Sequence, residues 1–145
     1  MMITRNNHIK ALCSAPPNQV MDLARALKPL FEVTTMALPE NGLGILKLRE
    51  TAGNDAFFIG EVPVSTAHVA LQKDGQTYHG GACILSDNQD LAQSIAILDA
   101  ILENELSGVV RCRELVEMGL DAIKERDTMR HTILARTKVA FNVLT

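Results

Sequence analysis

Apolar positions in the first thirty residues recur at helical spacing. One short stripe lies within residues 9–13, and a second runs through residues 20–31 at intervals of three and four residues. Pro16 and Pro17 separate the two stripes, and proline is tolerated in the first turn of a helix but not in its interior. The pattern therefore predicts two short N-terminal helices that meet at an angle.

Between residues 31 and 86 the pattern changes to extended segments. Turn-forming residues separate these segments at Pro39, Asn41-Gly42, Gly53-Asn54 and Asp74-Gly75. Proline is confined to edge strands and strand starts, so Pro63 indicates one of these positions. This block predicts an antiparallel β-meander of about four strands.

The strongest local signal in this block is the stretch LQKDGQTY. Asp74-Gly75 favours a two-residue type I′ turn, which needs positive φ at both central residues. Folding the chain about this turn pairs Leu71 with Tyr78 and Val69 with Gly80. One face of the hairpin then carries Val69, Leu71, Tyr78, Ala82 and Ile84, and the other carries His68, Ala70, His79, Gly81 and Cys83.

The residues before this hairpin do not keep its alternation. Val62 and Val64 have the opposite parity from Val69, and a strand that changes face must bulge or bend. We therefore expect an irregularity near Ser65 and Thr66.

The last block returns to helical spacing. Asp87 or Asn88 can cap a helix whose apolar stripe spans residues 91–102, and Gly108 is expected to end it. A second helix is expected at about residues 109–123 and a third near Met129. In the tail, Val139, Phe141 and Val143 alternate with other residues, which predicts a closing strand that joins its own sheet or a partner's.

These elements together predict an α+β fold in a single domain over residues 1–145. With 145 residues and 47% apolar side chains, the chain can bury one core. We expect short N-terminal helices, the antiparallel sheet, and C-terminal helices that pack on one sheet face or reach to a partner.

Composition narrows the classes of partner. The net charge of −3, the single tyrosine and the absence of tryptophan argue against nucleic acid. Cys13, Cys83 and Cys112 form no CxxC pair, which argues against a disulfide framework and a thiolate zinc site and fits reduced thiols in the cytoplasm. No apolar run approaches the roughly 20 residues that span a bilayer, so we expect a soluble, unexported protein without a membrane partner.

The stretch TYHGGACILSD gathers several reactive side chains. His79 and Cys83 are four residues apart on one strand, about 13 Å between Cα atoms at roughly 3.3 Å per residue, which is too far for a catalytic dyad. The HGG run is similar to the oxyanion loop of some esterases, but no GxSxG motif accompanies it. A bulge or a close backbone approach explains Gly80 and Gly81 better.

A metal site is the sharper hypothesis for this face. His68 is diagonal to His79 in the predicted hairpin, about 7 to 8 Å between Cα atoms, and Cys83 lies on the same face. The commoner explanation of two such histidines is that they are solvated polar residues. An independent small metal-binding or hydrolase domain that uses His68, His79 and Cys83 is therefore the alternative to a binding or assembly subunit.

Asp99 stands apart from the other carboxylates because it lies beside the apolar stripe of its helix. It is expected to cap a loop or to pair with an arginine. No GxGxxG, GxxxxGK[ST], HExxH or EF-hand motif is present, so the residues indicate no catalytic, cofactor-binding or metal site.

Several segments resemble one family in order and spacing. They are Arg49 to Glu61, with its glycine loop, Phe57-Phe58 pair and Gly60-Glu61 step; Val64 to Val69; Ser86-Asp87-Asn88 leading into an alanine-containing helix with Asp99-Ala100; residues 137–144; and Leu12 to Pro16. Together they resemble the PhnG family, a subunit of the bacterial carbon-phosphorus lyase core complex. The chain departs from that family at Thr51 to Asn54, where the family has a richer glycine loop, and at Ser86 to Asn88, where the family has Gly-Arg-Asp.

The resemblance implies an accessory role in phosphonate catabolism. That complex displaces adenine from ATP with a phosphonate and so forms ribose 1-phosphonate 5-triphosphate. The implied partners are the sister subunits of the complex, with a homodimer as a further option. The residues expected at the partner interface are Phe57, Phe58, Gly60, Glu61 and Phe141, although the aromatic residues among them suit a core equally well.

Overall fold

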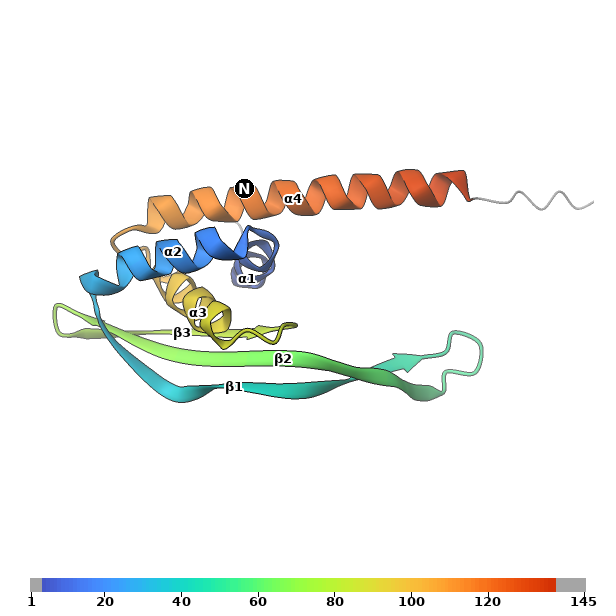
Figure 1. Cartoon of the computed structure of the whole chain (residues 1–145), viewed down its shortest axis with the longest axis horizontal. Helices are drawn as coiled ribbons and strands as arrows, with labels where there is room; N and C mark the ends of the chain where they lie inside the picture. Colours follow the sequence, from blue (N-terminus) through green and yellow to red (C-terminus); the bar gives the residue numbers. More distant parts are fainter. Residues whose placement is uncertain (1–3, 138–145) are drawn as a thin grey trace, which may run out of the picture.

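The computed structural model describes residues 4–137, which form three layers. An antiparallel sheet lies at the bottom of Figure 1, short helices cover one of its faces, and the long helix α4 lies above them. Helix α3 packs on β2 and β3, whereas α4 contacts α1, α2 and α3. The predicted α+β class is confirmed.

The two N-terminal helices are present as predicted. Helix α1 spans Arg5–Ser14, α2 spans Pro17–Leu27, and the short 3-10 helix η1 follows at Lys28–Leu30. Proline stands in the first turn of α2, where its missing N–H leaves no intrahelical hydrogen bond unmade. The apolar stripe of α2 is buried through Val20, Leu23, Ala24 and Leu27.

The sheet has three strands among the described residues, where about four were expected. Strand β1 spans Glu32–Arg49, β2 spans Ala56–Lys73 and β3 spans Gln76–Ile84, in the order β1-β2-β3. Pro39 and Asn41-Gly42 lie inside β1 and do not end it. Since β1 is an edge strand, Pro39 can sit there, and the pairing register with β2 shifts between Ala37 and Glu40.

The β2–β3 hairpin has the predicted turn and register. Asp74 and Gly75 have φ angles of 51° and 77°, and Leu71 pairs with Tyr78 as Val69 pairs with Gly80. The irregularity expected near Ser65 and Thr66 lies in the facing strand: β2 keeps its register with β3 there, whereas β1 shifts between the pairs Ala37–His68 and Glu40–Thr66. Val62 and Val64 simply belong to the opposite face of β2, beyond the end of β3.

Up to residue 137, the C-terminal half contains two helices where three were expected. Helix α3 spans Gln89–Glu103, and Asn88 caps it by accepting a hydrogen bond from the Leu91 N–H at 2.9 Å. Gly108 does not end α3 but precedes α4 with a φ of 95°. Helix α4 runs unbroken over Val109–Arg136 because residues 124–128 contain no helix breaker. The predicted closing strand at residues 139–143 lies outside the described residues.

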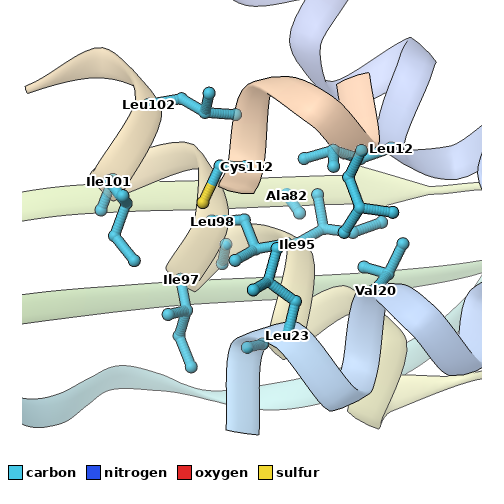
Figure 2. Packing of buried hydrophobic residues seen from close by; sticks show 14 of the residues in the cluster. Leu12, Val20, Leu23, Ala82, Ile95, Ile97, Leu98, Ile101, Leu102 and Cys112 are labelled. Carbon is cyan, nitrogen blue, oxygen red and sulfur yellow. The ribbon is translucent and has the colours of Figure 1, made fainter. Parts of the chain in front are cut away.

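The core lies between the sheet and the helices (Figure 2). Its centre is made by fully buried side chains of α1, α2, α3 and α4, including Leu12, Val20, Ile95, Leu98, Ile101 and Cys112. Two glycines allow the closest contacts. A Cβ atom on Gly80 would lie 2.0 Å from the Ala96 carbonyl oxygen, and one on Gly119 would lie 2.0 Å from the Ala11 carbonyl oxygen. Gly80 therefore marks a close backbone approach, as expected from the HGG run.

Candidate interaction surface

The two long strands continue past the rest of the sheet. Strand β3 ends at Ile84, opposite Ser65, so within the described part of the chain residues 42–49 of β1 and 56–64 of β2 pair only with each other. We call this two-stranded segment the arm. In Figure 1 it extends beyond the helical layer.

The arm carries an unusual amount of exposed apolar surface. Seven large apolar residues are exposed on it: Leu43, Ile45, Leu46, Leu48, Phe57, Phe58 and Ile59. Phe58 is 66% exposed and Leu43 is 68% exposed, which is far from the burial expected of core residues. Contiguous apolar surface of this kind marks an interaction site in a soluble protein.

Both faces of the arm carry exposed apolar side chains. Asn41 and Ser65 point to the helix side, and alternation from Asn41 places Leu43 and Ile45 on that side as well. Leu46 and Leu48 then lie on the opposite face. Among residues 4–137 the arm has neither a covered face nor a third strand. A two-stranded ribbon of this kind is only marginally stable alone.

A buried hydroxyl group anchors the base of the arm. The Ser65 Oγ lies 2.7 Å from the Asn41 Oδ1 and 2.6 Å from the Ser86 carbonyl oxygen, and it accepts a hydrogen bond from the Asn88 N–H at 3.0 Å. Asn41 also donates to Asp87 at 2.8 Å. These hydrogen bonds fix strands β1 and β2 to the start of α3. Asn41 therefore takes part in this network and does not form the turn that Asn41-Gly42 suggested.

Helix α4 also extends past the layer below it. Its buried residues end at Ile123, although the helix continues to Arg136. The remaining half carries the exposed apolar residues Met129, Ile133 and Leu134. In Figure 1 this half and the arm project toward the same end of the molecule.

The one fully buried carboxylate of the described core has a structural role. Asp99 accepts two hydrogen bonds from Arg5, at 3.1 Å from Nε and 2.6 Å from a terminal guanidinium nitrogen, and a third from the Gly81 N–H at 3.1 Å. The hydrogen bond to Asp99 raises the pKa of Arg5 further above its ordinary value. Asp99 therefore joins α1, α3 and β3, which confirms the arginine pairing that its position suggested.

The two histidines on the open sheet face are neighbours. The ring centroids of His68 and His79 lie 5.6 Å apart, as their diagonal register requires. Cys83 pairs with Thr66 and is thus diagonal to His68 on the far side from His79. Within residues 4–137, no three His, Cys, Asp or Glu side chains come together as a set of metal ligands.

Comparison with known proteins identifies the family. The family model described as "Phosphonate metabolism protein PhnG" matches residues 3–145. The chain belongs to the PhnG family. This membership places the protein in phosphonate metabolism and agrees with the resemblance of the segments around Phe57-Phe58 and Asp99-Ala100. No curated protein matches the sequence.

The family's aromatic pair lies on the arm. Phe57, Phe58, Gly60 and Glu61 are all exposed residues of β2, so the alternative that Phe57 and Phe58 belong to the core is wrong. Their role at a partner interface stays a prediction, and Phe141 lies outside the described residues. No helix in the described part of this PhnG family member is long and apolar enough to cross a membrane.

Sequence reasoning missed most of this surface. Leu43, Ile45, Ile133 and Leu134 look like core residues in a hydrophobicity pattern, because the pattern reports apolarity and not burial. Their exposure became apparent only from the structure, in which no helix among residues 4–137 packs on the apolar residues of the arm.

Proposed function

We propose that this protein is an accessory, non-catalytic subunit of the carbon-phosphorus lyase core complex. In this role it supports the formation of ribose 1-phosphonate 5-triphosphate from ATP and a phosphonate, in the cytoplasm, while sister subunits carry the chemistry. The observation that carries the proposal is the arm, whose two faces are apolar and exposed. Membership of a phosphonate metabolism family supplies the context.

The free energy available from burying this apolar surface favours a permanent partner over a transient one. Burial of apolar surface contributes about 25 cal/mol per Å², and a fully buried Leu or Phe contributes about 1.5 to 3 kcal/mol. Burial of the seven exposed apolar side chains of the arm by a partner would therefore contribute a large favourable free energy of association. Interfaces of obligate complexes are apolar in this way, like a core divided between two chains.

Co-expression of the chain with the sister subunits tests the proposal. We expect the chain to co-elute with them at a fixed stoichiometry on size-exclusion chromatography. A chain that elutes separately from all of them, while the others still assemble, would contradict the proposal.

The second candidate function is an independent metal-binding domain, which the neighbouring rings of His68 and His79 favour. The pair supplies two imidazole ligands, and Cys83 is too far along the face to complete a compact set. Metal analysis of the purified wild type beside the His79→Ala variant separates the candidates. Stoichiometric metal that is lost on substitution would favour this second function.

A further inference from the structure

The arm and the free half of α4 prolong the two outer layers of the fold. Within the body, α3 packs on β2 and β3 and also contacts α4, with α1 and α2 beside it, so the short helices form a middle layer between the sheet and α4. Past α1 the two outer layers continue toward the same end of the molecule (Figure 1). The middle layer does not continue with them among residues 4–137.

The face that α4 turns toward the middle layer can be followed along the helix. Gly119 contacts Ala11 of α1, and Ile123 is buried on the same side. Steps of seven and eleven residues keep to one helical face, so this face continues through Arg126, Arg130 and Leu134. Beyond the body it therefore presents two guanidinium groups and an exposed leucine.

The arm turns apolar residues toward the same layer. Leu43 and Ile45, which are 68% and 63% exposed, follow Asn41 on the helix side near the base of the arm. Farther out, the register shift between Leu46 and Lys47 leaves Ile59 without a partner on β1. The residues closest to the body thus form an apolar surface on the side of the arm that faces the helical layers.

The charge on this face of α4 is not balanced within the described chain. Asp127 flanks the two arginines, but neither Arg126 nor Arg130 makes an ion pair among residues 4–137. Because one carboxylate lies beside two guanidinium groups, this face of α4 carries a net positive charge. Guanidinium groups at an interface favour carboxylates of the partner, which they can bind through two hydrogen bonds.

We propose that one helix of a sister subunit lies between the arm and the free half of α4 and continues the middle layer. Its apolar face packs on Leu43 and Ile45, and its acidic residues pair with Arg126 and Arg130. A helix fits because, inside the body, helix α3 lies in this middle layer and contacts both the sheet and α4. This inference rests on the proposed function, since it names the partner element of the same surface.

Site-specific photocrosslinking tests the inference. The photoreactive residue p-benzoylphenylalanine replaces Ile45 in one variant and Arg130 in another, in the full chain co-expressed with the sister subunits. We expect both probes to label the same partner segment, within about ten residues of each other, because a helix rises about 1.5 Å per residue. The same probe at Val110, exposed at the other end of α4, should not label that segment.

The outcomes separate the inference from the proposed function. Labels on two different segments, on a strand, or on a second copy of this chain would overturn the inference while co-elution still supports the accessory role. Failure to co-elute before crosslinking would overturn both.

Charge reversal gives an independent readout. The double variant Arg126→Glu and Arg130→Glu should weaken association with the sister subunits by about tenfold or more, and the loss should shrink as salt is raised. Arg111→Glu on the same helix, over the body, is the matched control and should leave association unchanged. Equal behaviour of the double variant and the control would overturn the ion pairing.

Discussion

Gly80 shows how little space the fold leaves between strand and helix. An added Cβ atom would lie 2.0 Å from the Ala96 backbone oxygen, which cannot move without displacing α3. We predict that Gly80→Ala destabilises the fold by about 3 kcal/mol or prevents folding, as overpacking does. Gly42→Ala is the matched control, because nothing lies within 4 Å of its added Cβ. Urea denaturation measures both, and a Gly80→Ala variant as stable as the control would contradict the packing described for α3.

The Arg5–Asp99 pair holds the N-terminal helix to the core. Replacing Arg5 by Met leaves the buried Asp99 carboxylate with only the Gly81 N–H as its hydrogen-bond donor. We predict a loss of about 2 kcal/mol, below the 3 to 5 kcal/mol typical of a fully buried pair, because the Arg5 side chain is 46% exposed.

The control for this pair is Arg25→Met, which removes an exposed pair with Asp22 and should change the free energy of unfolding by less than about 0.5 kcal/mol. Thermal and chemical denaturation provide the comparison. Equal effects of Arg5→Met and Arg25→Met would show that the buried pair contributes nothing beyond a surface contact.

The thiols of Cys83 and Cys112 are predicted to differ in reactivity. Burial raises the pKa of Cys112 to about 12, whereas Cys83 is exposed on the open sheet face. In the native protein at pH 8, iodoacetamide should therefore alkylate Cys83 and spare Cys112, as intact-mass analysis and peptide mapping will show. Rapid alkylation of Cys112 without denaturant would contradict its placement in the core.

The same burial predicts a pH dependence of stability. Because the pKa of Cys112 is higher in the folded state than its ordinary value of 9.0, the folded protein holds this proton more tightly. The stability contributed by the neutral thiol is complete below about pH 9 and is lost as the pH rises toward 12. A Cys112→Ala variant should lack this component of the alkaline decline.

At the scale of elements, the arm is the part whose residues do least for the fold. Phe58 is 66% exposed, so Phe58→Ser should change the free energy of unfolding of the isolated chain by less than about 0.5 kcal/mol. The same variant should weaken association with the sister subunits, because an apolar interface contact is lost. Isothermal titration or quantitative pull-down measures the second effect.

The matched control for the arm is Leu85→Ser. Leu85 is 75% exposed but lies beyond the end of β3 and outside the arm. It should alter neither stability nor association. If Phe58→Ser unfolds the isolated chain, then the aromatic ring belongs to the fold and not to an interface.

How far each element could be predicted depended on how local its determinants are. The β2–β3 hairpin followed from Asp74-Gly75, because two adjacent residues fix the turn and the register. Asn88, a helix-capping residue, and Pro17, a residue favoured in the first turn, likewise indicated where α3 and α2 begin. The length of β1 was not predictable in this way, since Pro39 and Asn41-Gly42 read as turns unless the edge position of the strand is known.

The contacts of the site residues were harder to predict from the sequence than the helices and strands. Asp99 could be recognised as unusual, but its partner Arg5 lies 94 residues away in the sequence. The family resemblance singled out the aromatic pair Phe57-Phe58 as interface residues, which stays a prediction, whereas its exposure required the structure. Apolarity alone does not distinguish a core residue from one that awaits a partner.

For the whole molecule, the arm and α4 give the fold two projecting layers with an open middle. This shape explains why so many apolar residues are exposed in a chain with 47% apolar side chains. It also explains why parts of the three longest elements, β1, β2 and α4, lie outside the core of the described chain. Under the proposed function, a partner would cover these projecting surfaces.

The most direct test of this account compares assembly of the wild type with that of the arm double variant Ile45→Ser and Phe58→Ser. Each chain is co-expressed with the sister subunits, and the complex is quantified by size-exclusion chromatography with light scattering. We predict that the wild type and Leu85→Ser co-elute at fixed stoichiometry and that the double variant elutes as a folded chain outside the complex. Full co-elution of the double variant would contradict the central claim that the arm is the assembly surface.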